Sequence, residues 1–538
     1  MDKLDLQTPN FTDENIEKLA TLFPNCVTEA HDEKGNVTKA IDFDLLKQEL
    51  SDNIVDGPRE RYQINWPGKR EALVSANTPI NKTLRPCREE SVDFDTTENL
   101  YIEGDNLEAL KLLQESYLGK IKMIYIDPPY NTGKDFVYKD NFTRTKGEEL
   151  EASEQIDEDG GRLVANPESN GRYHSDWLTM MYSRIKLARN LLKDDGIILL
   201  SIDDNEVQNL KKICDEIFGE DNFVAQIMPI ANPGGRDYNQ IAVTHEYLLI
   251  FIKTDKAILN EISKDVNFKL TDNNGGYELR ELRNRNPKFH SGNRPNLFYP
   301  FFVNPNGKDS YNHCPVSLVK TDEYYIEVSP YNSTGKESVW RWGKPKSSEN
   351  IVADDLVKSQ IVARQKKDGG WNIYEKNRRS TTKVKSIWDE TEMRTENGTR
   401  LLRSLFEETI FDHPKSLSLL KRNVEIASNP NDIILDFFSG SATTAHAVMQ
   451  QNAEDNGNRK FIMVQFPEEL SEDSAAFKAG YETITEIGKE RIRRAGKKIK
   501  VENADKDGIE DLDTGFRVLK IDSSNMKDVY YSPDFNLY

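Results

Sequence analysis

An acid, two prolines and an aromatic residue, Asp127-Pro128-Pro129-Tyr130, end the apolar run Ile121–Ile126. Neither proline can donate a backbone hydrogen bond, and each disfavours helical geometry in the residue before it. We therefore expect the acid on a stiff, extended corner at the carboxyl edge of a sheet, where open α/β sheets bind ligands. Carboxylate and carbonyl acceptors beside an aromatic plate suit one task, which is to hold the exocyclic amino group of a flipped base. An ordinary strand-ending turn would explain the same four residues.

A second candidate site follows the short apolar strand Asp432–Leu435. It is a turn of mostly small residues that leads into the helix-like stretch Ala445–Gln451, and it reads Asp436-Phe437-Phe438-Ser439-Gly440-Ser441-Ala442-Thr443-Thr444. A strand, a turn and a helix in this order offer backbone N–H groups and a helix N-terminus to a ligand. The turn lacks the Gly-Lys-Ser/Thr of a P-loop and is not a dinucleotide-binding Gly-x-Gly-x-x-Gly. It suits a compact, polar, non-phosphate ligand such as a cofactor that carries an amino acid; a plain strand-to-helix turn is the alternative.

Together the two motifs resemble motifs IV and I of the amino-group DNA methyltransferases that use S-adenosylmethionine. Their order, with the catalytic motif first, resembles that of the permuted β-class. More closely, the chain is similar to the modification (Mod) subunits of type III restriction–modification systems, over roughly residues 60 to 500. The stretches that carry the resemblance are Trp66–Arg70, Leu100–Leu113, Lys122–Tyr138, Ser175–Glu206, His245–Lys253, Arg294–Pro300, Ile387–Trp388, His413–Thr444 and Gly480–Ala495. It implies a doubly wound, Rossmann-like α/β methyltransferase sheet with an inserted target-recognition domain.

The first motif fits the chemistry of adenine. The amino lone pair of adenine is delocalised into the ring, so the nitrogen is a poor nucleophile until it becomes tetrahedral. The Asp127 carboxylate and the Pro128 carbonyl can each accept one amino hydrogen, which stabilises the developing positive charge. Tyr130 would stack on the flipped base. This chemistry needs no metal, and the sequence offers no convincing metal-binding cluster. His245 would either line the base pocket or serve only as a structural residue.

The second motif is expected to bind S-adenosylmethionine, with Asp436 ordering the loop. The resemblance implies that Lys415 and Ser416 meet the carboxylate of the cofactor and that Asp105 bonds its adenine or ribose. Ala442 stands where the family often has glycine, and alanine tolerates a positive φ poorly. Phe411 and Phe437 would pack on the cofactor's adenine or simply in the core, and either Gln465 or Glu468 would bind its ribose. The full set of expected cofactor residues is Asp436, Phe437, Ser439, Gly440, Ser441, Thr443, Lys415, Ser416 and Asp105.

The charge distribution points to one basic module in an acidic chain. The net charge is −19, yet residues 280–385 hold 20 lysines and arginines against 11 aspartates and glutamates. Basic and aromatic residues alternate there, as expected of a surface that binds DNA. The candidate DNA contacts are Arg283, Arg285, Lys288, Arg294, Arg378 and Arg379.

Alternation of strand and helix signals on both sides of this module predicts a split catalytic sheet. We expect an interaction segment at 1–90, the catalytic half at 91–255, a target-recognition domain at 256–400, the cofactor-binding half at 401–500 and an unassigned tail at 501–538. Ser175 is a predicted helix cap, and Gly196 a predicted helix end. The four scattered cysteines show no metal-ligand spacing, and no apolar run reaches membrane-spanning length. We therefore expect reduced thiols in a soluble, cytoplasmic protein.

Three functions of different classes remain open. The resemblance favours a type III Mod subunit that methylates adenine N6 in double-stranded DNA through a flipped adenine. As such it would form a homodimer and would join a helicase–nuclease restriction (Res) subunit. A stand-alone β-class methyltransferase acting on adenine N6 or cytosine N4 is the main alternative, and a non-catalytic DNA-reading subunit is disfavoured because both loops are intact apart from Ala442. The chain has no Walker-type Gly-Lys-Ser/Thr loop, so any dependence on ATP must come from a partner.

Overall fold

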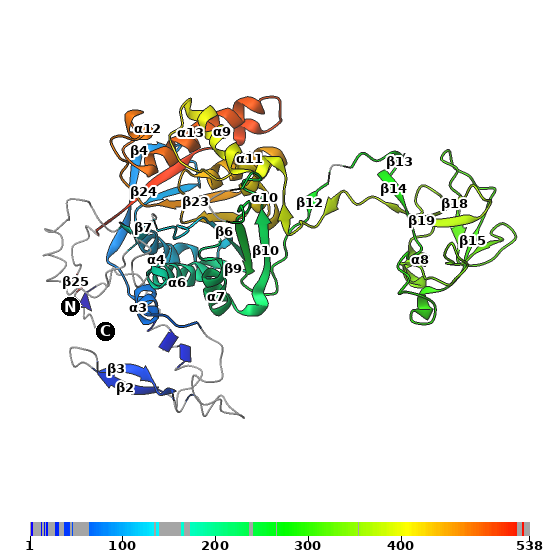
Figure 1. The fold of residues 1–538 in the computed structure, drawn as a ribbon, viewed down its shortest axis with the longest axis horizontal. Helices are drawn as coiled ribbons and strands as arrows, with labels where there is room; N and C mark the ends of the chain where they lie inside the picture. Colours follow the sequence, from blue (N-terminus) through cyan, green and yellow to red (C-terminus); the bar gives the residue numbers. More distant parts are fainter. Residues whose placement is uncertain are drawn as a thin grey trace, which may run out of the picture. The chain divides into compact units, whose positions relative to one another are not determined.

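The structure of the protein is a computed structural model with two compact units. It describes residues 64–133, 173–235, 240–264, 266–352 and 355–523, with short segments between residues 2 and 46 and at 136–138, 163–165 and 530–531. The first unit comprises residues 1–260 and 385–538, and the second comprises residues 261–384 (Figure 1). The second unit is therefore inserted into the sequence of the first.

A large mixed sheet forms the centre of the first unit. In spatial order its strands are β21 (Ile387–Trp388), β10 (Phe223–Pro229), β11 (Tyr247–Ile252), β9 (Leu192–Ile202), β6 (Ile121–Ile126), β22 (Ile433–Asp436), β23 (Lys460–Gln465), β5 (Leu100–Glu103), β24 (Phe516–Ser523) and β4 (Lys82–Val92). The six strands from β9 to β24 run parallel, whereas β11 pairs antiparallel with β9 and β4 pairs antiparallel with β24. This is the doubly wound, Rossmann-like arrangement expected from the sequence.

The chain order reverses between β6 and β22, which are neighbours in the sheet although about 300 residues separate them in the chain. Leu435 of β22 stands opposite Ile124 of β6. Because these two strands are parallel, their carboxyl ends meet at the same edge of the sheet. A reversal of this kind opens a crevice at the carboxyl edge, where such sheets bind ligands.

Helices lie on both sides of this sheet (Figure 1). One layer holds α3 (Lys69–Asn77), α4 (Asn106–Tyr117), α6 (Tyr173–Leu191) and α7 (Val207–Phe218); the other holds α9 (Thr395–Phe406), α10 (Leu417–Ala427), α11 (Thr443–Asp455), α12 (Ala475–Lys478) and α13 (Ile484–Glu502). Helix α6 shows why the first layer forms, because Trp177, Met181, Ile185 and Ala188 recur at helical spacing and are all fully buried. The core beneath them includes alternate residues of the central strands.

Four elements have the bounds that sequence patterns indicate: the apolar runs Ile121–Ile126 (β6), Tyr247–Ile252 (β11) and Lys460–Gln465 (β23), and the helical pattern Leu417–Ala427 (α10). Two predictions about α6 were wrong. Ser175 is not its cap, because the helix already includes Tyr173, and Gly196 does not end it, because the helix stops at Leu191 and Gly196 lies within β9. The sequence also shows a helical pattern in Glu14–Leu22 and Phe43–Leu50, and these stretches lie largely outside the described residues.

Both terminal segments contribute strands to the sheet. Residues 82–92 form β4, and residues 516–523 form β24, which lies between β4 and β5. Among the residues that the structure describes, this unit also has three short ladders: β1 (Asp2–Lys3) with β25 (Tyr530–Tyr531), β2 (Val27–His31) with β3 (Val37–Ile41), and β7 (Phe136–Tyr138) with β8 (Leu163–Ala165). The sheet therefore uses more of the chain than the predicted catalytic halves.

The second unit is mainly antiparallel β-structure. It contains β12 (Ile262–Ser263), β13 (Leu270–Asp272), β14 (Gly275–Glu281), β15 (Phe301–Val303), β16 (Val316–Ser317), β17 (Ile326–Val328), α8 (Lys344–Glu349), β18 (Ile361–Gln365), β19 (Trp371–Asn377) and β20 (Thr381–Thr382). Its core gathers buried side chains around Trp340. Where the chain enters and leaves the unit, β12 pairs with β20, which brings the two connecting segments together.

Within the part of the chain that the structure describes, no helix is long and apolar enough to cross a membrane. Three of the four cysteines, Cys87, Cys214 and Cys314, are described, and all are free and buried. Burial raises the pKa of each of these thiols, which disfavours the reactive thiolate.

Candidate active site

The two candidate loops stand side by side at the carboxyl edge of the sheet. Asp127 follows β6 directly, and Asp436 is the last residue of β22, the neighbouring parallel strand. Asp127 is partly exposed, with 28% of its side chain accessible, whereas Asp436 is buried. The structure thus brings together two motifs that lie far apart in the sequence.

Side chains of α6 and of the residue before α7 hold the first motif in place. The indole Nε1 of Trp177 in α6 donates a 2.8 Å hydrogen bond to the Pro129 carbonyl. The following residue, Asn131, has a φ of 59°, a conformation that asparagine tolerates better than most residues. Its amide donates to the buried carboxylate of Glu206 at 2.6 Å, and Glu206 also bonds His174 at 2.6 Å. These contacts fix the backbone of the motif from α6 and α7.

Four polar side chains contact one another beside the first motif: Asp127, Tyr130, Glu246 and Lys415. The ammonium group of Lys415 lies 2.5 Å from Glu246 and 3.3 Å from Asp127. The Tyr130 hydroxyl lies 3.0 Å from Asp127 Oδ1 and 3.1 Å from Glu246 Oε2, within reach of both carboxylates. Lys415 also contacts Tyr130, with its nitrogen 2.5 Å from the hydroxyl oxygen and 4.8 Å from the ring centre.

Burial and charge act against each other in this cluster. Burial raises the pKa of Asp127, Lys415 opposes that rise, and Glu246 adds to it. Burial disfavours the charge of Lys415, but the two carboxylates raise its pKa above the usual lysine range. Lys415 therefore stays cationic and holds two acids that would otherwise repel each other.

The position of Lys415 differs from the one expected from the sequence, and Glu246 is a site residue that the sequence analysis did not name. Lys415 was expected at the carboxylate of a cofactor, but it contacts the side chains of the first motif. Glu246 was not singled out; its neighbour His245 was, and the His245 ring packs edge-on against Tyr247. An antiparallel strand that follows a parallel one starts at the carboxyl edge, so the position of Glu246 just before β11 was a usable signal.

The second loop is ordered by its own acid. Asp436 accepts hydrogen bonds from the backbone N–H of Phe438 at 3.1 Å and from the Thr444 hydroxyl at 2.5 Å. Burial raises the pKa of Asp436 to about 7. Gly440 has a φ of 48°, and its backbone N–H donates to Gln465 Oε1 at 2.7 Å. The loop is thus pinned to the ends of both β22 and β23.

Ala442 adopts the left-handed conformation, with a φ of 58°, immediately before α11. The tight turn needs this conformation, and a side chain larger than a methyl group would be more strained there. Ala442 is fully buried, so its methyl group also packs in the core. Alanine therefore maintains the shape of the turn at this position.

A buried arginine supports the loop from behind, which sequence reasoning missed. Arg491 of α13 is fully buried and donates to the hydroxyls of Ser441 at 2.9 Å and Thr443 at 2.6 Å. Burial lowers the pKa of Arg491 to about 9. The regular helical pattern of α13 gave no sign that this arginine points inward.

The other residues expected at the cofactor have the following surroundings. Asp105 caps α4 by accepting from the N–H groups of Leu107 and Glu108, and it lies 3.6 Å from the buried Arg184. Ser416 occupies the N-cap position of α10 without a side-chain capping bond, and its hydroxyl donates to the Glu392 carbonyl at 2.6 Å. Phe437 is fully buried, in keeping with a core role, and Phe411 approaches Gly440. Glu468 is half-buried just after β23, and burial raises its pKa.

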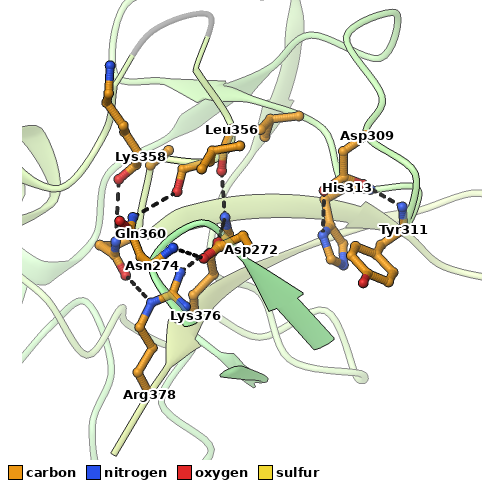
Figure 2. Close-up of polar contacts among 12 residues, drawn as sticks. Asp272, Asn274, Asp309, Tyr311, His313, Leu356, Lys358, Gln360, Lys376 and Arg378 are labelled. Atoms are coloured by element: carbon orange, nitrogen blue, oxygen red, sulfur yellow. Dashed lines mark hydrogen bonds and ion pairs between the residues drawn. The ribbon is translucent and has the colours of Figure 1, made fainter. Parts of the chain in front are cut away.

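The candidate DNA contacts in the second unit fall into two groups. Arg378 pairs with the mostly buried Asp272 at 2.6 Å and so helps to hold the unit together, and the more exposed Arg379 pairs with Glu261 at the surface. Figure 2 shows Lys376 and Arg378 converging on Asp272. The more exposed group comprises Arg285, Lys288 and Arg294. Arg283 has intermediate exposure and forms an ion pair with Glu281.

Figure 2 also shows a second cluster in this unit, in which the buried His313 Nδ1 donates a 3.0 Å hydrogen bond to the Asp309 carboxylate. Burial lowers the pKa of His313, and Asp309 opposes that effect. Among the residues that the structure describes, no group of three or more histidine, cysteine, aspartate or glutamate side chains could hold a metal ion.

Comparison with known proteins gives a consistent result. A family model described as "DNA methylase" matches residues 121–476. The EcoPI Mod subunit of Escherichia phage P1, a type III restriction-modification enzyme, is 36% identical over 90% of this chain and 75% of its own length. The StyLTI Mod subunit of Salmonella typhimurium is 33% identical over 91% of this chain and 71% of its own. The type II methyltransferase M.KpnI of Klebsiella pneumoniae is 32% identical over 74% of this chain and 87% of its own length.

Proposed function

The chain belongs to the DNA methylase family and, within it, to the Mod subunits of type III restriction–modification enzymes, and we propose that it methylates adenine N6 in double-stranded DNA. The observation that carries this proposal is the juxtaposition of Asp127 and the Asp436 loop on the neighbouring strands β6 and β22. One loop offers acceptors for an amino group, and the other offers a helix N-terminus and backbone N–H groups for a cofactor.

The first motif has the acceptors that the target amino group needs. The Pro129 carbonyl is already bonded to Trp177, so we assign the two amino hydrogens to the Asp127 carboxylate and the Pro128 carbonyl. Asp127 is the acceptor whose interaction strengthens as positive charge develops on the nitrogen. Lys415 contacts the hydroxyl end of Tyr130, whose ring packs against the core and is only partly buried, and we assign the flipped adenine to the exposed side of the ring.

The second loop fits S-adenosylmethionine. When bound, this cofactor supplies an electrophilic methyl group. Gly440 has no side chain to fill the space between the loop and Phe411, since an added Cβ would stand 3.6 Å from that ring. Ser439 Oγ is buried in this loop and faces the hydroxyl of Tyr101. The loop residues Asp436, Phe437, Ser439, Gly440, Ser441 and Thr443 would form this site, Arg491 supporting it through the last two hydroxyls.

Asp127→Ala tests the catalytic assignment. We expect it to abolish methyl transfer and to leave the binding of cofactor and of DNA unchanged, because the lost interaction is strongest in the transition state. Transfer of a tritiated methyl group to DNA measures the activity, and calorimetry measures cofactor binding. Asp204→Ala is the matched control, since Asp204 is an exposed acid just beyond β9 that bonds Tyr247. Near-normal methylation by Asp127→Ala would refute the assignment.

The inserted unit is the proposed reader of the DNA sequence. It carries the basic surplus of the chain, and its exposed Arg285, Lys288 and Arg294 are the candidates for contacts with phosphates or base edges. Exchanging residues 261–384 for the same segment of a related Mod subunit should change the methylated sequence, which long-read sequencing of modified bases detects. A folded chimera that methylates the original sequence would place recognition elsewhere.

A homodimer joined to a helicase–nuclease Res subunit is the proposed assembly. The similarity to Mod subunits covers about nine-tenths of this chain, whereas the similarity to M.KpnI covers about three-quarters. The sequence outside the shared methylase region therefore favours a Mod role over a stand-alone type II enzyme. Co-expression with a neighbouring helicase–nuclease gene, followed by chromatography with light scattering, is the test. A protein that is monomeric and never co-elutes would favour the stand-alone alternative, for which the similarity to M.KpnI is the support.

A further inference from the structure

Methylation of adenine N6 produces a proton that the protein must accept. In the step, the N–C bond forms, the S–C bond of the donor breaks, and its electron pair stays on sulfur. N6 is then cationic and must lose one hydrogen as a proton, whose bonding pair becomes the nitrogen lone pair. The amino hydrogens point at Asp127 and Pro128 in the proposed function, on which this inference rests, and a carbonyl oxygen is too weak a base to keep a proton.

We propose that Glu246 is a second carboxylate of the methyl-transfer site and takes up this proton from Asp127 through the Tyr130 hydroxyl. The hydroxyl oxygen stands 3.0 Å from Asp127 Oδ1 and 3.1 Å from Glu246 Oε2. It can accept a proton from one acid while donating its own to the other, so no charge is left on the tyrosine. The proton ends on Glu246, and Asp127 is again an ionised acceptor.

The charge of the cluster matches one proton. With both acids ionised, Asp127, Glu246 and Lys415 together carry a single negative charge, which one proton cancels. Lys415 bonds Glu246 at 2.5 Å and lies 3.3 Å from Asp127, where its positive charge opposes the rise that burial causes in the Asp127 pKa. The other titratable groups that face Asp127 are Tyr125 of β6 and Asp436 of β22. Neither is within the described hydrogen-bond chain of Tyr130.

Glu246 belongs to a cluster at the margin of the protein interior. Its side chain is 16% exposed, compared with 12% for Lys415 and 28% for Asp127. Glu246 comes from the loop just before β11, and Asp127 comes from the end of β6, two strands away in the sheet. The tyrosine of the motif therefore connects two separate segments, a role distinct from stacking on the base.

Two isosteric variants test the path in the full-length protein. Glu246→Gln removes the terminal acceptor, and Tyr130→Phe removes the hydroxyl while keeping the aromatic ring. We expect each to lower the single-turnover methylation rate by about 10²-fold, the lower end of the range for proton transfer by a positioned side chain. The double variant should be little worse than either single one, because the residues act as one path. Tyr247→Phe is the matched control, since it removes a 2.7 Å tyrosine–aspartate bond next to Glu246 and should leave the rate unchanged.

Measurements without turnover separate a proton path from a structural role. DNA binding and base flipping, followed with 2-aminopurine at the target position and no cofactor, should be unchanged in both variants. Infrared titration of the carboxylates should show a lower pKa for Asp127 in Glu246→Gln, because the Glu246 charge raises it in the wild type. The acidic limb of the rate–pH profile should move to lower pH in parallel.

Several results would overturn the proposal. A normal rate in Glu246→Gln excludes Glu246 as the acceptor, and a normal rate in Tyr130→Phe excludes the relay. Equal losses of rate at every pH, with weakened DNA binding, would indicate a structural role instead. If the wild-type protein itself methylates no adenine in DNA, the proposed function fails first; an active wild type with unaffected variants leaves that function intact and removes only the proton path.

Discussion

The indole of Trp177 donates a hydrogen bond of 2.8 Å to the carbonyl of Pro129. Trp177 is fully buried in α6, so the bond ties the catalytic motif to the core of the sheet domain rather than to another loop. It also satisfies a carbonyl that has no ladder partner, since proline residues interrupt the backbone hydrogen bonding there. The rigidity of the motif thus has two sources, the proline rings and one side chain from the layer below.

Trp177→Phe should slow catalysis without weakening binding. The change leaves the Pro129 carbonyl unpaired and lets the motif shift, and a displacement of ~1 Å can cost about 10²-fold in rate. Single-turnover methylation and calorimetric cofactor binding are the measurements. Trp66→Phe is the matched control, because Trp66 is also buried and its indole donates to Thr179 of the same helix at 3.0 Å. Similar rates in the two variants would show that the Trp177 bond does not position the motif.

Asp436 should make stability fall as the pH rises. Burial raises its pKa to about 7 in the folded protein, whereas an exposed aspartate titrates near 3.9. Between about pH 4 and pH 7 the folded state therefore holds a proton that the unfolded chain has lost, and stability decreases with increasing pH through this window. Asp436→Asn cannot ionise, so its stability relative to the wild type should improve from about pH 5 to about pH 7 in urea denaturation. A pH-independent difference would contradict the shift.

Gly488→Ala should weaken cofactor binding. Gly488 lies where α13 crosses the second loop, and an added Cβ would stand 2.7 Å from the Tyr101 hydroxyl and 3.2 Å from the Gly440 carbonyl oxygen. The helix must then move away from the loop, and overpacking of this kind costs about 1–3 kcal/mol. Calorimetric titration with S-adenosylmethionine measures the loss of affinity. Gly343→Ala, where the nearest atoms would be 3.8 Å away, is the control; equal affinities in both variants would contradict the argument.

The sequence predicted the centre of the sheet well and its margins poorly. Strands such as β6 are continuous apolar runs because both of their faces are buried, so composition alone marks them. Edge strand β4 is mostly polar and exposed, and β24 contains charges that pair across the sheet, as Lys520 does with Glu90. Such strands are defined by pairing between distant segments, which no local pattern reveals.

The site shows the same division. Asp127 and Asp436 were recognisable because each follows an apolar strand directly. The neighbours of Lys415 could not be read from its own segment, because its contact with Asp127 joins residues nearly 290 positions apart. The inward orientation of Arg491 likewise depends on how α13 packs against α11. Residue types at strand ends were predictable, and the contacts among them required the tertiary fold.

The arginines of the inserted unit should separate into structural and DNA-binding residues. Arg378 pairs with the mostly buried Asp272 and lies 4.9 Å from the centre of the Tyr277 ring, so Arg378→Ala should destabilise the unit. Burial opposes the charge of Asp272, yet Arg378 and Lys376 lower its pKa, so loss of either cation leaves the acid less well compensated. Arg285 is 78% exposed, and its ion pair with Glu281 should add less than about 1 kcal/mol to stability.

Arg285→Ala should therefore leave the melting temperature unchanged and weaken DNA binding. If Arg285 contacts a phosphate, the slope of log affinity against log salt concentration should also become shallower by about one unit. Arg378→Ala should lower the melting temperature and should affect the salt slope little, because its charge is already paired with Asp272. Differential scanning calorimetry and fluorescence anisotropy over a salt series distinguish the two outcomes. The reverse pattern, with a stable Arg378→Ala that has lost the salt dependence, would make Arg378 the DNA contact and Arg285 a solvated surface charge.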